Sequence, residues 1–425
     1  MSDKKNDKKN SRQVSLAGAA GKKKSSSKKK ISKKGMWIAL GALVAVIVLL
    51  IVLLAGSCQK TGQTLTGGQM VQYTVTPEDK AADVSYYALG VLGKNSTDRM
   101  DMCAVLCYDR KAGKATILQL PVTAYLGEDG SFRATVVGDV WGNPKPITWC
   151  NTCRGKVAEQ DVDGDKHKGC GSKLTTKKGS AFSDYSRVFN AQYGLPIDNY
   201  LVIPRAGLAK LIDAVGGVDM QVSGKFTLDD VTYDKGVRTL SGEAAVYYAV
   251  EYNYNKTPAS DVERMMRQRQ LFASLLDRLS RYEVAELYNE DETKADILSN
   301  IILGADPIRY DTTSFGKSRL MGISEKKAEN VKYIEAMARF MYDISHVSKK
   351  NITYCLAPGT AVKHGTSYVY SVHKEQTISL LKQYMNPYGL TMDGSTVAIP
   401  ELKANPADAD SAVTTLDKVL VKAAQ

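Results

Sequence analysis

Short apolar runs bounded by turn residues dominate the chain from Val84 onward. The runs at residues 84–93, 102–109 and 114–121 end at Gly, Asp or Pro, which is typical of buried strands. Their lengths are too short for helices of a buried layer. We therefore predict three strands in close succession at the start of a folded domain.

The next part of the chain alternates between strand and helix patterns. Residues 183–194 predict a helix ended by Gly194, residues 199–204 a strand, residues 205–217 a helix closed by two glycines, and residues 218–222 another strand. The last three elements form a βαβ succession, which places two parallel strands in one sheet. The predicted fold class is α/β, with a central mixed, largely parallel sheet flanked by helices.

The stretch "SDVERMMRQRQLFASLLDRLSRY" predicts a long helix that begins at Ser260. Ser260 and Glu263 have the spacing of a capping box. Five apolar residues at helical spacing form one stripe, namely Met265, Phe272, Leu275, Leu276 and Leu279. Arg264, Arg267 and Gln268 lie on the face beside this stripe.

Three further segments complete the pattern. Residues 242–252 fit a helix or a strand equally well, whereas residues 326–345 and the run 377–389 predict helices of an outer layer. The residues after Gly394 contain few aromatic side chains and read as a C-terminal appendage.

Residues 36–55 form an uninterrupted apolar stretch without any charge. At about 1.5 Å per residue, such a helix spans a hydrocarbon core of about 30 Å. Lysine runs precede it, and the positive-inside rule keeps such a flank in the cytoplasm. We predict one transmembrane signal anchor, over residues 36–56, with the N-terminus cytoplasmic and the folded domain outside the cell. A cleaved signal peptide would have a shorter apolar region, and a lipoprotein signal at Cys58 would have poor spacing.

The net charge of +12 belongs almost wholly to the N-terminus. Residues 1–34 contain 12 Lys and Arg12 against Asp3 and Asp7, so +11 of this charge lies before the apolar stretch. The rest of the chain is nearly neutral, which removes the case for a nucleic-acid partner. The basic segment, residues 1–35, is too rich in Lys, Ser and Gly to bury a core, and we predict a disordered tail held near anionic lipid.

These patterns divide the chain into parts with different roles. Residues 57–83 have the composition of a linker, residues 84–392 form the extracytoplasmic domain, and residues 393–425 form the appendage. Within the domain, residues 127–180 are an insertion, because a compact connection between a strand and a helix does not need so many residues.

The insertion contains "WCNTCRG" and "HKGCGS". Cys150, Cys153, His167 and Cys170 follow the spacing C-x2-C-x13-H-x2-C, and four N and S ligands in two turns suit tetrahedral Zn²⁺. Outside a cell two of the three thiols can instead form a disulfide, and a segment with neither is the third alternative. A closed site of four ligands would be structural, with no open position for catalysis.

Three segments in a fixed order carry a resemblance to a known family. They are "ALGVLGKNSTDRMDMCAVLCYDRKAGKATILQLP", "YGLPIDNYLVIPRAGLAKLIDAVGGVDMQV" and "LSGEAAVYYAVEYNYNKTPASDVERMMRQRQ". Over about residues 84–285 the chain resembles the LytR-CpsA-Psr (LCP) family, and the similarity is weaker to about residue 390. The most specific matches are "LIDAVGGVDMQV" and the D-x-x-R-x-x-R-Q segment that begins at Asp261.

The resemblance implies a function and a site. An LCP protein binds a polyprenyl pyrophosphate-linked glycan in an apolar groove, uses Mg²⁺, and transfers a phosphoglycan, such as a teichoic-acid or capsule-like polymer, to peptidoglycan. Asp101 would be the Mg²⁺ ligand. Arg99 would contact phosphate, and Arg264 and Arg267, with Gln268 and Asp261 beside them, would form a second clamp around the leaving group.

The family's pattern of arginines is incomplete in this chain. Val122 and Thr123 stand where the family has Arg-Asp after its third strand, Val250 and Tyr252 stand where it has arginines, and Asn95 and Thr97 replace an Asp and an Arg. Lys94 or Arg205 are candidate replacements. The alternative function is therefore a catalytically weakened LCP-like protein that binds lipid-linked glycan or scaffolds envelope assembly. A transcription attenuator is disfavoured, because the basic tail contains no DNA-reading element.

Overall fold

The structure is a computed structural model in which the chain divides into two units, residues 1–59 and 60–425. The described residues all belong to the second unit. They are residues 61–66, 69–74, 84–93, 99–177, 179, 181–197, 199–255, 258–288, 297–298, 309–312, 327–402 and 413–423. The predicted tail (1–35) and transmembrane anchor (36–56) lie outside them. Among the helices of the described residues, none is long and apolar enough to cross a membrane.

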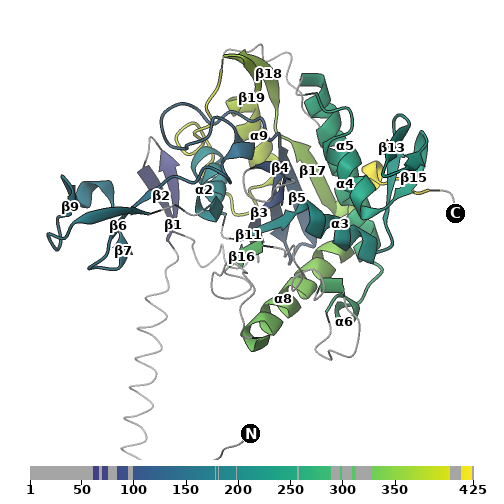
Figure 1. The fold of residues 1–425 in the computed structure, drawn as a ribbon, viewed down its shortest axis with the longest axis horizontal. Coiled ribbons are helices and arrows are strands. Elements are labelled where there is room, and N and C mark those ends of the chain that lie inside the picture. Colours follow the sequence, from purple (N-terminus) through teal and green to yellow (C-terminus); the bar gives the residue numbers. More distant parts are fainter. Residues whose placement is uncertain are drawn as a thin grey trace, which may run out of the picture. The chain divides into compact units, whose positions relative to one another are not determined.

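A sheet of seven strands forms the centre of the described domain (Figure 1). Its spatial order is β16 (Arg309–Thr312), β11 (Asn199–Pro204), β3 (Val84–Leu92), β4 (Met100–Asp109), β5 (Lys114–Leu120), β17 (Ile352–Leu356) and β20 (Val413–Thr415). The pairs β11–β3 and β5–β17 are parallel. The other four neighbouring pairs are antiparallel.

The prediction of a mixed sheet is confirmed, but the prediction that it is largely parallel is wrong. The connections between β3 and β4 and between β4 and β5 are only a few residues long, whereas a parallel connection needs a dozen or more. The predicted βαβ unit is also wrong. After α3 (Arg205–Ala214), strand β12 (Val218–Val222) leaves the central sheet and pairs with β15 (Gly236–Leu240) in an antiparallel ribbon.

Helices cover both faces of the sheet (Figure 1). Helices α3, α4 (Gly242–Val250), α5 (Pro258–Leu279) and α8 (Lys327–His346) pack on one face, and α2 (Ala181–Arg187), the π-helical turn η4 (Val188–Gln192) and α9 (Lys374–Tyr384) pack on the other. Along β3, Tyr87 and Val91 belong to the first core and Tyr86, Ala88 and Leu92 to the second. Burial of both faces explains why these strands read as continuous apolar runs.

The ends of the domain differ from the predicted boundaries. Within the predicted linker 57–83, β1 (Thr61–Thr66) and β2 (Gln69–Thr74) form an antiparallel hairpin. The predicted appendage 393–425 contributes β20 to the edge of the central sheet, followed by α10 (Leu416–Val419). Both segments are polar, and edge strands need little apolar sequence because one side of the strand faces no partner.

The remaining elements are short. They are η2 (Val137–Asp139), β6 (Ile147–Cys150), β7 (Gly155–Lys156), η3 (Glu159–Asp161), β8 (Val162–Asp163), β9 (Lys166–His167), β10 (Leu174–Lys177), β13 (Phe226–Leu228), β14 (Val231–Tyr233), α6 (Val284–Leu287), η5 (Lys349–Asn351), β18 (Gly359–His364) and β19 (Ser367–Val372). Elements β6 to β10 all belong to the predicted insertion.

Helix α5 begins earlier than predicted. Its first residue is Pro258, and proline is favoured at this position because its missing N–H is not needed in the first turn. Ser260 and Glu263 both lie inside the helix, so the predicted capping box is wrong. The predicted stripe is confirmed, since Met265, Leu275, Leu276 and Leu279 are buried and Phe272 is half-buried against the same core.

The motif "LIDAVGGVDMQV" joins α3 to its neighbours. The carboxylate of Asp213 accepts a hydrogen bond of 2.7 Å from the backbone N–H of Gly242, at the start of α4. Gly217 has φ +82°, and a Cβ there would lie 2.7 Å from the carbonyl oxygen of Leu240. Both contacts fix the ribbon and α4 relative to α3, which accounts for the motif structurally.

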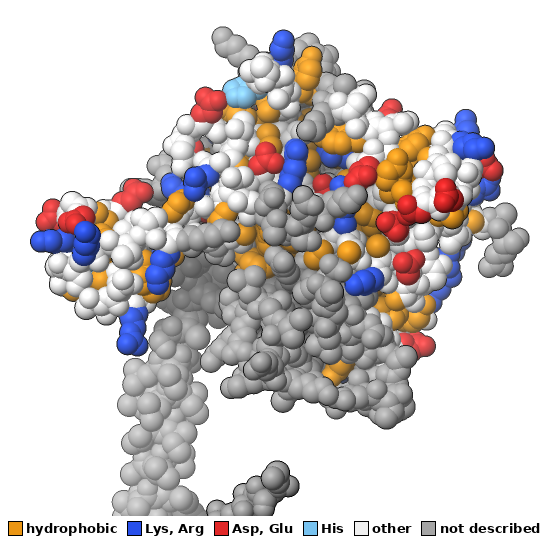
Figure 2. Space-filling view, in the orientation of Figure 1, with side chains coloured by type: hydrophobic (Ala, Val, Ile, Leu, Met, Phe, Trp, Pro, Cys, Tyr) orange, Lys and Arg blue, Asp and Glu red, His pale blue; other side chains and the backbone are white. Residues whose placement is uncertain are grey.

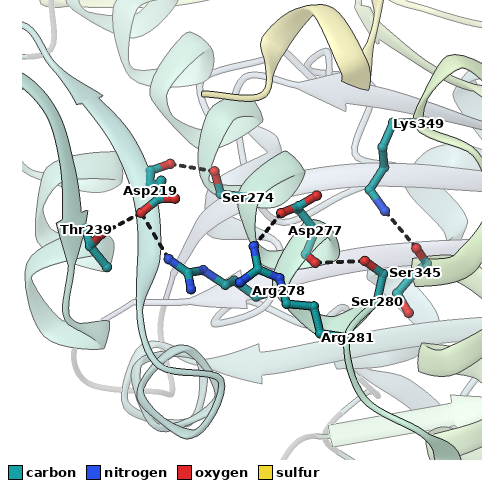
Figure 3. Close-up of polar contacts among 9 residues, drawn as sticks. All are labelled: Asp219, Thr239, Ser274, Asp277, Arg278, Ser280, Arg281, Ser345 and Lys349. Carbon is teal, nitrogen blue, oxygen red and sulfur yellow. Dashed lines mark hydrogen bonds and ion pairs between the residues drawn. The ribbon is translucent and has the colours of Figure 1, made fainter. Parts of the chain in front are cut away.

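Asp219 of the same motif holds the C-terminal half of α5 (Figure 3). Its Oδ1 accepts 2.6 Å from the hydroxyl of Thr239 and 3.0 Å from Arg278, and its carbonyl oxygen accepts 2.5 Å from Ser274. Because Ser274 and Arg278 are four residues apart on one helix face, α5 is tied to the β12–β15 ribbon along a full turn.

Gly242→Ala tests the close packing of α3 on α4. A Cβ at this position would overlap the backbone carbonyl of Ala209, and overpacking of this kind costs about 1 to 3 kcal/mol. We expect the free energy of unfolding of the full chain, measured by denaturant titration, to fall by that amount. Gly394→Ala is the control, because its Cβ would only reach the ammonium of Lys374 at 3.7 Å. Equal stability of the two variants would contradict the packing described.

Candidate functional site

The sheet topology brings Asp101 and Arg205 to one edge. Pro204, at the end of β11, pairs with Leu92 of β3, and Leu92 pairs with Met100 at the start of β4. The residues that follow, Arg205 at the start of α3 and Asp101 of β4, therefore lie together. The guanidinium of Arg205 forms ion pairs with the carboxylates of Asp101 and of Glu251, which follows α4.

These pairs define the electrostatics at this edge. Burial acts to lower the pKa of Arg205, but the hydrogen bonds and charges of Asp101 and Glu251 outweigh it and raise the pKa. Arg205 is therefore a permanent cation between two acids. The sequence suggested Arg205 as a replacement for a missing arginine, and the structure places it beside Asp101.

Gln268 fastens α5 to this edge of the sheet. Its side-chain amide donates a 3.1 Å hydrogen bond to the backbone carbonyl of Asp101 and accepts one of 2.7 Å from the amide of Gln119 on β5. Both glutamine side chains are buried. One side chain of α5 thus contacts two neighbouring strands, and it lies next to Asp101 as predicted.

Arg264 is almost completely buried among other side chains. It forms an ion pair with Asp261, one turn earlier in α5, and its guanidinium carbon lies 3.8 Å from the ring centroid of Tyr254. Only 3% of its side chain is exposed, and among the described residues its Nε has no hydrogen-bond partner. Asp261 in turn accepts a hydrogen bond from Thr123, the residue that stands where the family has an Asp.

Arg267 does not face the same space as Arg264. Its Nε and Nη2 each donate a 2.7 Å hydrogen bond, to the backbone carbonyls of Tyr248 and Tyr252. Its Nη1 lies 3.9 Å from the carboxylate of Glu263, and burial lowers its pKa. The guanidinium thus caps the C-terminal end of α4. Its predicted role as a phosphate ligand is not supported by these contacts.

Arg99 is partly exposed to solvent. Its Nε is 3.3 Å from the carboxylate of Asp139, and 38% of its side chain is exposed. The buried thiol of Cys103 follows Asp101 on β4. Burial raises its pKa to about 12, a hydrogen bond from Tyr185 opposes this rise, and the charges of Arg264, Asp101 and Arg99 also act on it.

An apolar cavity extends from this cluster between the sheet and helices α3, α5 and α8. Its volume is about 160 Å³. The walls include Ala104, Leu106, Leu271, Leu275 and Ile344, and the two amide side chains in the walls are Gln119 and Gln268. Because Gln268 also bonds Asp101, the polar end of the cavity adjoins the charged cluster.

The chemistry of Asp101 partly fits a magnesium ion. Mg²⁺ takes oxygen ligands, typically one or two carboxylates with substrate phosphates and water. Oδ2 of Asp101 is engaged by Arg205, whereas no described residue donates a hydrogen bond to Oδ1. The second nearby acid, Glu251, also contacts Arg205. In the described part of the chain, Oδ1 is therefore the oxygen of Asp101 that no cation engages.

Other positions of the family's arginine set lie in the core. Val122, Val250 and Tyr252 are buried among apolar side chains, so no charged group replaces an arginine there. The structure adds Glu251, Tyr254 and Gln119 to the site. Glu251 and Tyr254 lie in the segment "YAVEYNYN", where the family has arginines. Their position in this segment is the sequence feature that could have predicted them as site residues. Nothing in the sequence around Gln119 marked it.

The predicted metal ligands of the insertion also lie together. One ligand atom from each of Cys150, Cys153, His167 and Cys170 lies within 4.8 Å of the others. This group belongs to the β6–β10 insertion, separate from the Asp101 cluster in sequence and chemistry.

Comparison with known proteins identifies the family. The sequence model of the LytR_cpsA_psr family matches residues 177–304. The cell wall biosynthesis protein LcpA of Corynebacterium glutamicum is 25% identical over 191 residues, which cover 44% of this chain and 34% of LcpA. Residues 177–304 of this chain belong to the LytR-CpsA-Psr family.

Other family relatives match shorter segments. The polyisoprenyl-teichoic acid–peptidoglycan teichoic acid transferase TagU of Enterococcus faecalis is 29% identical over 109 residues, 24% of this chain and 35% of TagU. The chain thus spans about a third of the length of LcpA and of TagU. Among solved structures, B. subtilis TagV is similar with a TM-score of 0.46 and 16% identity, over 72% of this chain and 98% of TagV.

Arg267→Met tests the structural role of this LCP arginine. The variant leaves the buried carbonyls of Tyr248 and Tyr252 without their donor, and an unsatisfied buried group costs about 1 to 3 kcal/mol. We expect the free energy of unfolding to fall by about 2 to 4 kcal/mol in denaturant titration. Arg281→Met, which removes an exposed arginine paired with Asp277, should change it by less than about 0.5 kcal/mol. A stable Arg267→Met protein that has lost pyrophosphate binding would restore the predicted role as a ligand.

Proposed function

We propose that this protein binds a polyprenyl pyrophosphate-linked glycan and transfers the glycan with its attached phosphate to a hydroxyl group of peptidoglycan. The observation that carries the proposal is the apolar cavity whose polar end adjoins Asp101 and Arg205. A lipid with a charged head needs this combination. The name of one relative, a polyisoprenyl-teichoic acid–peptidoglycan teichoic acid transferase, describes the same class of reaction.

The cavity would hold the polyprenyl chain. Its walls are side chains such as Ala104, Leu106 and Leu275, and each buried CH₂ group contributes about 0.8 kcal/mol to binding. The cavity lies under α5, which is fixed by Gln268 at its middle and by Asp219 in its C-terminal half. The lipid would thus enter a space that is already formed, which reduces the ordering cost of binding.

The pyrophosphate would lie beside Arg205, Arg264 and Arg99. Each arginine has N–H groups beyond those that contact its acid, and the guanidinium fork matches phosphate oxygens. These side chains would neutralise the charge that develops on the leaving phosphate. Gln268 and Gln119 would set the position of the Asp101 backbone beside it.

Mg²⁺ would be held by Asp101 together with phosphate oxygens, and it would supply further charge neutralisation at the pyrophosphate.

In the transfer, an oxygen of the acceptor hydroxyl bonds to the phosphorus that carries the glycan. The bond from that phosphorus to the bridging oxygen breaks, and polyprenyl phosphate leaves with the electron pair. The hydroxyl proton is released to solvent or to the departing phosphate. The predicted anchor at residues 36–56 would place this reaction at the outer surface of the cell membrane.

A second candidate is a family member that binds the lipid without turnover. The observation in its favour is that the arginines at the site already have acidic partners, namely Asp139, Asp101 with Glu251, and Asp261. Incubation of the full chain with lipid-linked glycan, a peptidoglycan acceptor and Mg²⁺ separates the two. Release of polyprenyl phosphate supports transfer, whereas binding without release supports the second candidate.

Arg264→Ala and Asp101→Ala test the head-group site with undecaprenyl pyrophosphate as the probe. Loss of a charge-assisted hydrogen bond costs about 1.5 to 3 kcal/mol, so Arg264→Ala should weaken binding by about tenfold or more with and without Mg²⁺. Asp101→Ala should weaken it to a similar degree only when Mg²⁺ is present. Arg281→Ala is the control for a general loss of positive charge. Unchanged affinity in both site variants would place the head group elsewhere.

Ala104→Phe tests the cavity. The added ring would occupy part of the lipid space at the wall formed by β4, so affinity for undecaprenyl pyrophosphate should fall by about tenfold, whereas inorganic pyrophosphate should bind as before. Ala112→Phe introduces the same side chain at an exposed turn and should change neither affinity. Equal lipid affinity in the two variants would show that the chain of the lipid lies outside this cavity.

A further inference from the structure

The insertion has almost no hydrophobic core of its own. Among residues 147–177, only Cys150 and Val157 are buried. Its strands β6, β7 and β10 form one small sheet, and β8 and β9 form a separate hairpin. Figure 2 shows charged and other polar atoms over much of its visible surface. A segment of this kind needs a covalent or metal crosslink to hold a single conformation.

The four predicted ligands meet where β6, the following turn and the turn after β9 converge. The Sγ atom of Cys170 lies 3.5 Å from that of Cys150 and 3.5 Å from that of Cys153. Nδ1 of His167 lies 3.4 Å from the sulfur of Cys153 and 3.3 Å from that of Cys170. Three sulfurs and one ring nitrogen thus surround a single point.

These separations match a tetrahedral metal site. Ligands at about 2.3 Å (sulfur) and about 2.0 Å (nitrogen) from zinc are roughly 3.5 to 3.8 Å from one another in a tetrahedron. A disulfide would require about 2.0 Å between two sulfurs, and all three cysteines are free. Three thiols around one histidine also exceed what one disulfide uses.

The backbone around both ligand pairs has the form of a turn that wraps an ion. The N–H of Cys153 points at the sulfur of Cys150 at 3.4 Å. Arg154, which follows Cys153, and Gly171, which follows Cys170, both have a left-handed backbone conformation, with φ +52° and +66°. The N–H of Gly171 donates 2.7 Å to the carbonyl of His167. At the first pair the strained left-handed position is thus held by Arg154 rather than by a glycine.

A side-chain contact joins the two turns beside the ligands. The hydroxyls of Thr152 and Ser172 lie 2.8 Å apart, and Thr152 lies between the first two cysteines while Ser172 follows the last. The turns are therefore held face to face by polar contacts on the outside and by the four ligands on the inside.

We propose that Cys150, Cys153, His167 and Cys170 bind one structural Zn²⁺ that holds the insertion together. His167 binds through Nδ1, and the three cysteines bind as thiolates, each releasing its proton to solvent. All four positions of the metal are occupied by protein, so the site is closed to substrate and serves folding. The metal also shields the exposed thiols of Cys153 and Cys170 from oxidation outside the cell.

Elemental analysis of the purified full chain tests the proposal. We expect about one equivalent of zinc per chain. Cys153→Ser and His167→Gln should each reduce it about tenfold, whereas His364→Gln, a histidine that contacts Glu128 away from the cluster, should leave it unchanged. After exchange, Co²⁺ should give the absorption of a tetrahedral ion with thiolate ligands. Less than about a tenth of an equivalent of zinc in the wild-type chain, or iron in its place, overturns the proposal.

Limited proteolysis gives a readout that does not depend on metal content. Trypsin sites at Arg154, Lys156, Lys166, Lys168 and Lys173 lie inside the insertion. Treatment with a zinc chelator should open cleavage at these sites while the thermal unfolding of the main domain stays the same. A count of free thiols in the native chain distinguishes a metal site from a disulfide. Loss of two thiols without metal would show a disulfide, and unchanged cleavage after chelation would show that no metal holds the segment.

Discussion

The pair of hydrogen bonds made by Gln268 is the contact on which the cavity and the charged cluster both depend. It joins α5 to the backbone of Asp101 on β4 and to Gln119 on β5, while Asp219 holds the far half of the helix. These contacts fix the middle and the C-terminal half of α5 over the sheet, and the cavity lies between this helix and the sheet. A buried polar link of this kind is costly unless satisfied, and here both amides have partners.

The helical period places the polar residues of α5 on different faces of the helix, where they make different contacts. Arg264 and Gln268 are four residues apart and face the sheet edge, whereas Arg267, one position before Gln268, turns toward the end of α4. Gln270 accepts a hydrogen bond of 2.8 Å from the N–H of Gln221 on β12. A run that reads as one basic cluster in the sequence is therefore divided between contacts at the sheet edge and packing against α4 and β12, because each residue rotates about 100° from the last.

The sequence was sufficient for local structure and insufficient for pairing. The runs at 84–93, 102–109 and 114–121 became β3, β4 and β5, and the stripe on α5 packs as expected, because burial dictates both patterns. The prediction of a largely parallel sheet was wrong, because the connections from β3 to β4 and from β4 to β5 are too short for parallel pairing. The positions of β12 and β20 were also predicted wrongly, because strand partners that are distant in the sequence leave no local pattern. In the site, Asp101 lies beside Arg205, which the sequence offered as a candidate replacement, whereas the roles of Arg99 and Arg264 as phosphate contacts stay predictions. Glu251 and Gln119 were missed, because their roles arise only from contacts with Arg205 and Gln268.

The acid partners of the arginines determine how this site can accept a phosphate. Arg264 and Asp261 are both buried, and separating such a pair without replacement is strongly unfavourable. A pyrophosphate bound as proposed would have to supply new acceptors at the same moment that it displaces a carboxylate. At Arg205 the exchange would have a further effect, since movement of its guanidinium toward phosphate would release Oδ2 of Asp101. The arginine and the carboxylate would then be available for opposite parts of the ligand.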